Sequence, residues 1–212
     1  MDPFAKVTGV AAPLPEPNID TDVIMPKQFL KGIDREGLAR GLFHDQRFTP
    51  AGEERPDFIL NRRPYRSAAF LIVGPNFGCG SSREHAVWGL RQFGVRAIVG
   101  TSFASIFQDN CFKNGLLVIS LSTPTVASLQ ARCAVAGTSR IEIDLIEQRI
   151  HLDDDAAIDF VVDPLHRDDL LAGRDAISLG LERLPAIESF EARHWSASPW
   201  FIPMSPEEVA GR

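Results

Sequence analysis

The stretch "SAAFLIVGPNFGCGSSREHAVWGLRQFGVRAIVG", residues 67–100, decides the fold class. Residues 67–74 form an apolar run that predicts a short buried strand, residues 83–94 carry apolar side chains at helical spacing, and residues 95–100 predict a second strand. A strand, a helix and a strand at this spacing make a βαβ unit, in which the strands lie parallel and the crossover is right-handed. The stretch therefore predicts an α/β protein.

The alternation of helices and strands continues downstream and then changes its period. The expected elements, in chain order, are a helix over residues 102–114, a strand over 115–121, a helix over 124–136, a hairpin over 140–152 that turns near Glu147–Gln148, and a strand over 157–162. The residue-by-residue alternation of the hairpin predicts an antiparallel element beside the parallel units.

The two ends of the chain give weaker signals than its centre. The chain of 212 residues is long enough for one substantial core. We expect a single domain over residues 1–212, with an N-terminal loop region over 1–60 and a C-terminal helical tail over 164–212. The first 25 residues contain four prolines and predict a loop, and a short helix is expected near residues 35–43.

The charge balance narrows the class of partner. The formal net charge of −6 leaves no basic surplus that could neutralise nucleic-acid phosphates or anionic lipids. The N-terminus lacks a basic segment followed by an apolar one, and no apolar run reaches the roughly 20 residues of a membrane span. We therefore expect a cytoplasmic protein that binds neither nucleic acid nor membrane.

The three cysteines do not form a recognisable framework. Cys79, Cys111 and Cys133 are odd in number and widely spaced, so they match neither a disulfide scaffold nor a CxxC metal site. We expect reduced, mostly buried thiols. No cofactor is expected in this chain, and an iron–sulfur cluster or zinc ion would need a second chain to hold it.

The glycine-rich segment "GPNFGCGSSREHAVWGL", residues 74–90, lies where a parallel strand ends and a helix begins. Ligands of open α/β sheets bind at this edge, a helix N-terminus favours an anion, and the guanidinium of Arg83 matches a carboxylate. A purely structural alternative stays open, because Ser81 and Glu84 have the spacing of a capping box. The segment lacks the nucleotide-binding glycine patterns, and His85 has no second histidine four residues away for a helical zinc pair.

Three motifs in one order carry a resemblance to a known family. They are "NIDTDVIMPKQFLK" (residues 18–31), "GPNFGCGSSREHAVWGL" (74–90) and "SFASIFQDNCFKNGLL" (102–117). Taken alone, the first motif predicts no more than local turns. Together the three resemble the small subunits of 3-isopropylmalate dehydratase in the aconitase superfamily, over roughly residues 1–200.

The resemblance implies a fold, a partner and a reaction. The fold is a swivel-type layered β/β/α domain that closes over a separate large subunit. In that family the large subunit holds a [4Fe–4S] cluster, one iron of which acts as a Lewis acid on the substrate hydroxyl. The reaction is the isomerisation of 2-isopropylmalate to 3-isopropylmalate in leucine biosynthesis, by loss and re-addition of water through isopropylmaleate. The chain is thus expected to be a hydro-lyase subunit that is active only with its large partner.

The resemblance also implies roles for five residues. The catalytic base of the family falls on Ser81, whose hydroxyl needs stabilising neighbours to act as a base near neutral pH. Ser82 and Arg83 fall on ligands of the substrate carboxylates. Thr21 and Asp22 match the family's N-terminal Thr-Asp pair, and we expect both at the substrate-binding site.

Two departures and two alternatives accompany this assignment. Aconitase has a substrate-binding arginine just beyond its Thr-Asp pair, whereas here the nearest basic residue in a comparable context is Lys31, in the loop "FLKGID" attributed to substrate choice, with Arg35 a little further on. Cys79 stands where aconitases tend to have an acidic residue. A related hydro-lyase acting on citraconate and 2-methylmalate, or on homoaconitate, remains an alternative. A non-catalytic, RNA-binding swivel relative is a second one, which the lack of basic patches disfavours.

Overall fold

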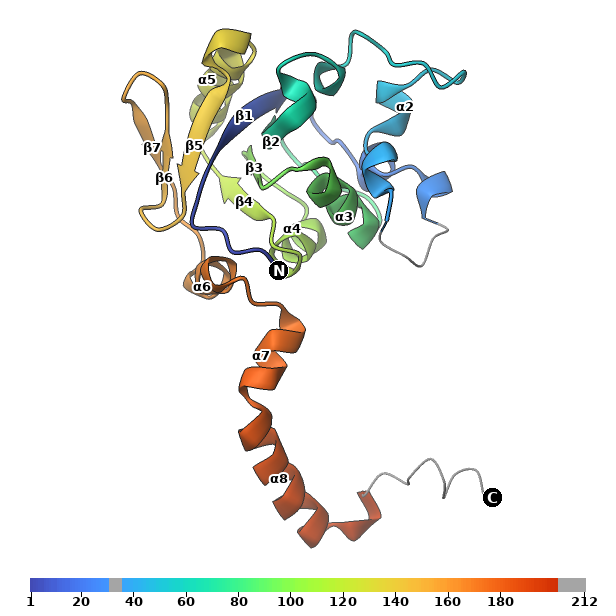
Figure 1. The fold of residues 1–212 in the computed structure, drawn as a ribbon, viewed down its shortest axis with the longest axis vertical. Coiled ribbons are helices and arrows are strands. Elements are labelled where there is room, and N and C mark those ends of the chain that lie inside the picture. Colours follow the sequence, from blue (N-terminus) through green and yellow to red (C-terminus); the bar gives the residue numbers. More distant parts are fainter. Residues whose placement is uncertain (31–35, 202–212) are drawn as a thin grey trace. The chain divides into compact units, whose positions relative to one another are not determined.

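Seven strands form one mixed sheet in the computed structural model, which describes residues 1–30 and 36–201 (Figure 1). The strand order is β4-β3-β2-β1-β5-β6-β7. The strands are β1 (Lys6–Leu14), β2 (Ala68–Val73), β3 (Ala97–Gly100), β4 (Leu117–Ser120), β5 (Arg140–Asp144), β6 (Arg149–His151) and β7 (Ala157–Asp159). Strands β1 to β4 pair in parallel, whereas β5 pairs antiparallel with β1, β6 with β5, and β7 with β6.

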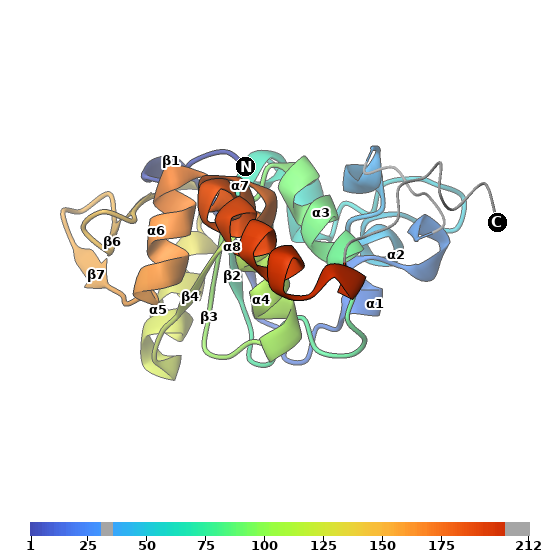
Figure 2. The same ribbon diagram turned by 90° about the horizontal axis from the view of Figure 1, so that it is seen from below.

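Helices connect and cover the parallel half of the sheet. The α-helices of this part are α1 (Thr21–Ile24), α2 (His44–Arg47), α3 (Glu84–Phe93), α4 (Ser105–Lys113), α5 (Thr123–Cys133) and α6 (Pro164–Ala172). Short 3-10 helices are η1 (Lys27–Phe29), η2 (Leu38–Arg40), η3 (Ile59–Asn61), η4 (Tyr65–Ser67) and η5 (Ala136–Thr138). Helix α5 packs against β1 and β2, and α3 packs against α4 and η2. Figures 1 and 2 place the β6–β7 hairpin and α2 at opposite ends of this part.

The chain divides into two compact units, residues 1–174 and 175–212. Helix α6, at the start of the region that we expected as a helical tail, belongs to the first unit. The described part of the second unit consists of α7 (Ala176–Glu182), α8 (Leu184–Ala197) and the 3-10 helix η6 (Pro199–Phe201). Among the described residues, no helix has the length and apolar character that crossing a lipid bilayer requires.

The strand–helix alternation predicted from residue 67 onward is confirmed. The strands expected at 67–74, 95–100 and 115–121 are β2, β3 and β4, and the helices between them are α3 and α4. The hairpin over 140–152 is also confirmed as β5 and β6. The predicted α/β class with an added antiparallel element is therefore confirmed.

The prediction of a loop over the first 25 residues is wrong for residues 6–14, which form β1. Strand β1 lies at the centre of the sheet, between β2 and β5, and Ala11 and Ala12 are fully buried there. Its glycine and proline hid the strand signal, because both residues are poor strand formers. Gly9 is needed because a Cβ atom at this position would lie 2.4 Å from the Ala69 Cβ of the neighbouring strand. Burial against two strands overrides the weak local propensity.

The helix expected near residues 35–43 is only partly present. The structure has the 3-10 turn η2 at Leu38–Arg40, and α2 begins after it at His44. Residue 35 lies outside the described residues. Gly37 and Gly41 flank η2, and two glycines so close together disfavour a continuous α-helix.

Candidate active site

The candidate site lies beyond the carboxyl ends of β1 and β2, where residues 18–22 and 75–83 run side by side. These segments prolong the parallel pairing of the two strands, in which Leu14 stands beside Val73. The backbone hydrogen bonds that join the segments run from the Asn18 N–H to the Pro75 carbonyl (2.9 Å), from Gly78 to Ile19 (2.8 Å) and from Thr21 to Cys79 (2.9 Å). The sheet thus brings the first two sequence motifs together although they are about 60 residues apart.

Glycine at position 78 lets the loop pass closely over α4. Gly78 has a φ angle of +75°, and a Cβ atom there would lie 2.2 Å from the Cγ of Phe107. Side chains other than glycine rarely adopt this backbone conformation, and none would fit against the Phe107 ring. The glycine-rich composition therefore serves a close contact between the loop and the first turn of α4.

A small cavity of about 80 Å³ opens between the loop and α4. Thr21, Gly78, Gly80 and residues 81–83 line one part of it, and residues 104–107 line the other. Helix α4 begins at Ser105 and α3 begins at Glu84, directly after the lining residues of the loop. The N-terminal N–H groups of a helix have no partner within the helix and favour an anion. Two helix N-termini at one cavity suit a ligand with carboxylates.

Arg83 and Asp22 form an ion pair at this cavity. The Arg83 side chain is 13% exposed, and the Asp22 side chain is 43% exposed. The hydrogen bond from Arg83 holds the pKa of the Asp22 carboxyl below its usual range. The guanidinium of Arg83 is thereby held in a defined orientation, which a flexible surface arginine would lack.

The capping-box alternative for Ser81 is wrong. Helix α3 begins at Glu84, its N-cap residue is Arg83, and no side chain caps it. The Glu84 carboxylate instead accepts a hydrogen bond of 2.7 Å from the Asn114 side chain. Ser81 is exposed, and its hydroxyl has no hydrogen-bond partner in the described part of the chain. Its side chain is therefore accessible to a ligand.

Thr21 is the buried member of the predicted set. It is 2% exposed, and its hydroxyl donates a hydrogen bond of 2.7 Å to the main-chain carbonyl of Ser81. Ser82, by contrast, is exposed at the cavity. The structure thus brings together all five residues that the motifs singled out, but it gives them different surroundings.

Three further comparisons with the sequence concern the start of α4, then His85, and then Lys31 with Arg35. The start of α4, residues 104–107, was not predicted as part of the site, although it follows the carboxyl end of β3 and so lies at the ligand-binding edge of the sheet. His85 packs against Trp88, with 4.6 Å between the centroids of the two rings. Lys31 and Arg35 lie outside the described residues.

The cysteines do not fit an iron–sulfur or zinc site. None is in a disulfide, and Cys111 and Cys133 are fully buried. Burial raises the pKa of the Cys133 thiol to about 11 and raises that of Cys111 well above its usual range. Among the described residues, no cysteine belongs to a group of three potential metal ligands. Cys79, the third cysteine, is only partly exposed.

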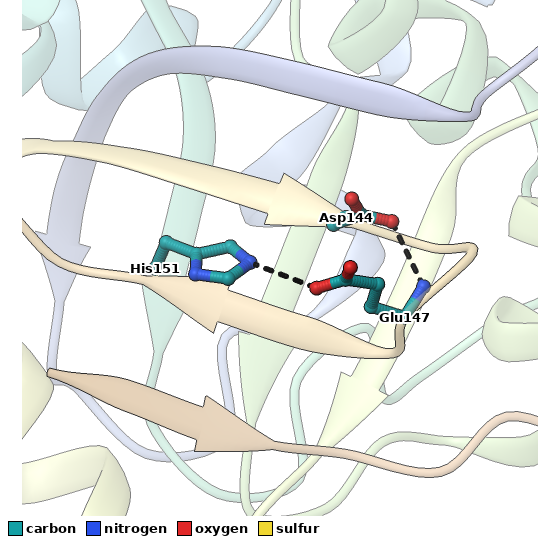
Figure 3. A group of neighbouring side chains, drawn as sticks. All are labelled: Asp144, Glu147 and His151. Carbon is teal, nitrogen blue, oxygen red and sulfur yellow. Dashed lines mark hydrogen bonds and ion pairs between the residues drawn. The ribbon is translucent and has the colours of Figure 1, made fainter. Parts of the chain in front are cut away.

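A second polar cluster lies on the β5–β6 hairpin, with Asp144 at the end of β5, Glu147 in the turn and His151 on β6 (Figure 3). The Asp144 carboxylate accepts hydrogen bonds from the Ile146 N–H (2.8 Å) and the Glu147 N–H (2.9 Å), and Lys6 lies 3.1 Å away. Burial acts to raise the pKa of Asp144, but these hydrogen bonds outweigh it and hold the pKa below its usual value. His151 lies 3.7 Å from Glu147. Because Asp144 is already satisfied, the cluster anchors the turn and is a poor metal site.

Comparison with known proteins finds a matching family model, relatives that align over nearly the full chain, and a solved structure. Residues 1–124 match the family model of the aconitase C-terminal domain. The chain is 55% identical over 207 residues to 3-isopropylmalate dehydratase small subunit 2 of Salmonella typhimurium, covering 97% of this chain and 99% of that protein. It is 50% identical to small subunit 1 of Mannheimia succiniciproducens, covering 94% and 98%. A solved structure of 3-isopropylmalate dehydratase from Methanocaldococcus jannaschii matches with a TM-score of 0.64 at 28% identity, covering 87% and 99%.

Proposed function

Because the chain belongs to the family of 3-isopropylmalate dehydratase small subunits, with the swivel-type α/β fold of the aconitase superfamily, we propose that it completes the active site of a cytoplasmic hydro-lyase. The reaction is the isomerisation of 2-isopropylmalate to 3-isopropylmalate by dehydration and rehydration, in leucine biosynthesis. The single observation that carries the proposal is the cavity where Ser81, Ser82 and Arg83 meet two helix N-termini.

Ser81 is the proposed catalytic base. A serine hydroxyl is too weak an acid to act as a base near neutral pH unless its anionic form is stabilised. The N-termini of α3 and α4 and the guanidinium of Arg83 provide a positive field at the cavity. In this role the Ser81 oxygen takes a proton from the carbon of the substrate and returns one during rehydration.

The carboxylates of the substrate are the proposed ligands of Arg83 and Ser82. The planar guanidinium can donate two parallel hydrogen bonds to one carboxylate. Asp22 supports this role by its ion pair with Arg83, which fixes the direction of the guanidinium. Ser82 adds a hydroxyl donor at the exposed side of the cavity. Thr21 belongs to the same site through its contact with Ser81.

A large subunit is the proposed partner, and the [4Fe–4S] cluster is proposed to belong to it. The cluster would supply a Lewis acid for the substrate hydroxyl, as the resemblance implies. The cysteines of this chain do not fit such a group, because two of them are fully buried and, among the described residues, none belongs to a group of three potential metal ligands. The exposure of Ser81 and Ser82 supports a site that a second chain closes.

Reconstitution tests the proposal directly. The chain and its large subunit are purified separately, the partner with its cluster intact, and isopropylmaleate is followed by its ultraviolet absorbance. We expect turnover of isopropylmalate only when both chains are present. Turnover by this chain alone would contradict the shared site, and no turnover by an intact, cluster-loaded complex would contradict the function.

A single substitution tests the role of Ser81 in the same assay. Ser81→Ala is expected to lower kcat by orders of magnitude, while assembly and the melting temperature stay unchanged. The structure supports an undisturbed fold, since Ser81 caps no helix and Thr21 bonds only to its main-chain carbonyl. Unchanged activity per assembled complex would remove Ser81 from the chemistry.

The alternative substrates are not favoured. The relatives named above from Salmonella typhimurium and Mannheimia succiniciproducens are 3-isopropylmalate dehydratase small subunits. A panel with 2-methylmalate, citraconate and homoaconitate in the reconstituted assay measures the preference. We expect the highest kcat/KM for isopropylmalate, because a pocket shaped for an isopropyl group leaves the further carboxylate of homoaconitate unpaired and is only partly filled by the methyl group of 2-methylmalate or citraconate.

A further inference from the structure

Thr21 makes two hydrogen bonds on either side of Gly80. Its N–H donates to the Cys79 carbonyl at 2.9 Å, and its hydroxyl donates to the Ser81 carbonyl at 2.7 Å. Thr21 is the first residue of α1, so its N–H has no partner within that helix and is free to bond to the loop. One residue therefore fixes two peptide units, the one between Cys79 and Gly80 and the one between Ser81 and Ser82.

The hydrogen bond to the Ser81 carbonyl also sets the direction of the N–H group that follows it. In a planar trans peptide the C=O and the following N–H point in opposite directions. Holding the Ser81 carbonyl toward Thr21 therefore turns the Ser82 N–H away from it, and holding the Cys79 carbonyl does the same for the Gly80 N–H. Neither of these N–H groups donates to another residue of the described chain. Both remain available to a ligand.

The hydroxyl of Thr21 is not available to a substrate in this arrangement. It is buried and already donates to a carbonyl. Gly80, with a φ angle of +89°, has no side chain that could hold the loop in place, and its backbone has the widest conformational freedom. A brace from outside the loop is therefore needed to keep the Ser81 main chain in one orientation.

We propose that Thr21 is a positioning residue, which braces the peptide units around Gly80 so that Ser81 and the Ser82 N–H face the reacting substrate. It acts through Ser81, because its hydroxyl donates to the Ser81 carbonyl and not to the substrate. The inference rests on the proposed function, because it assigns Thr21 a part in the same reaction.

The test uses the complex with its large subunit and three substitutions. Thr21→Val keeps the shape of the side chain and removes the donor, and it should lower kcat by about 10- to 100-fold, since a misplaced catalytic group costs rate. KM should change by less than about threefold, because Arg83 still binds the carboxylates. Thr21→Ser keeps the hydroxyl and should retain most of the wild-type kcat. If the valine variant does not assemble, Thr21→Ala takes its place.

Thr138 provides the matched control. Its hydroxyl also donates to a main-chain carbonyl, that of Arg132, at 2.8 Å, and it lies in η5, outside the lining of the cavity. Thr138→Val should lose a comparable amount of stability and leave kcat unchanged. A fall in kcat for both valine variants would indicate a general loss of folded complex, and would contradict a positioning role.

A double substitution separates action through Ser81 from an independent effect. In the Ser81→Ala background, Thr21→Val should lower kcat by less than about twofold further, because residues that act as a unit are not additive. Full additivity, or a wild-type kcat for Thr21→Val alone, overturns the proposal. A wild-type complex that does not turn over isopropylmalate would instead contradict the proposed function, so the two failures are distinguishable.

Discussion

Gly78→Ala offers the sharpest test of the loop geometry. The substitution places a Cβ atom 2.2 Å from the Cγ of Phe107, and it forces alanine into a backbone conformation with φ at +75°. The left-handed conformation costs about 1–2 kcal/mol for a residue with a side chain. Overpacking against a ring costs about 1–3 kcal/mol more. The free energy of unfolding should therefore fall by about 2–5 kcal/mol.

Denaturant unfolding, followed by circular dichroism, measures this loss. Gly137→Ala is the matched control, because a Cβ atom at position 137 meets nothing within 4 Å and the backbone there is not left-handed. The control should change the free energy of unfolding by no more than about 0.5 kcal/mol. The reconstituted complex of the Gly78 variant should also lose activity, because Phe107 lies in the first turn of α4 and lines the cavity.

A loss of less than about 1 kcal/mol for Gly78→Ala, or a loss no larger than that of the Gly137 control, would contradict the predicted clash with Phe107. Such a result would mean that the loop and Phe107 are not in close contact. It would also remove the reason for placing the N-terminus of α4 at the site. A variant as stable as the wild type but less active would contradict the close contact with Phe107 and would indicate only that the loop takes part in binding.

Three further predictions address binding, pH and thiol reactivity. Arg83→Lys should mainly raise KM in the reconstituted assay, because a point charge cannot reproduce a two-pronged contact with a carboxylate. The folded-state pKa of Asp144 lies below its ordinary value, so its contribution to stability is present above about pH 4 and is lost as pH falls through the folded-state pKa. Urea unfolding at several pH values should show that Asp144→Asn loses less stability at low pH than the wild type. An unchanged loss at low pH would contradict the lowered pKa of Asp144. Native labelling with a thiol reagent should modify Cys79 and spare Cys111 and Cys133 until unfolding, whereas early modification of either buried thiol would contradict their burial.

Part of the site was predictable because its residues are contiguous. The motif of residues 74–90 contains Ser81, Ser82 and Arg83, and its place after an apolar run at a helix start predicts an anion-binding edge. The same local signals left the capping-box alternative open. Only the observed helix start at Glu84 excluded it, because a capping role depends on where the helix begins and not on spacing alone.

Local signals were sufficient to predict the strand–helix alternation after residue 67, the hairpin over 140–152 and the order of the motifs. Features that depend on pairing between distant segments became visible only in the folded structure. Strand β1 occupies the centre of the sheet despite its glycine and proline, because two neighbouring strands bury it. That pairing sets Thr21 beside Ser81, and the proposed positioning role of Thr21 rests on this contact. Propensity acts over a few residues, whereas hydrogen bonds between strands depend on the register of the whole sheet.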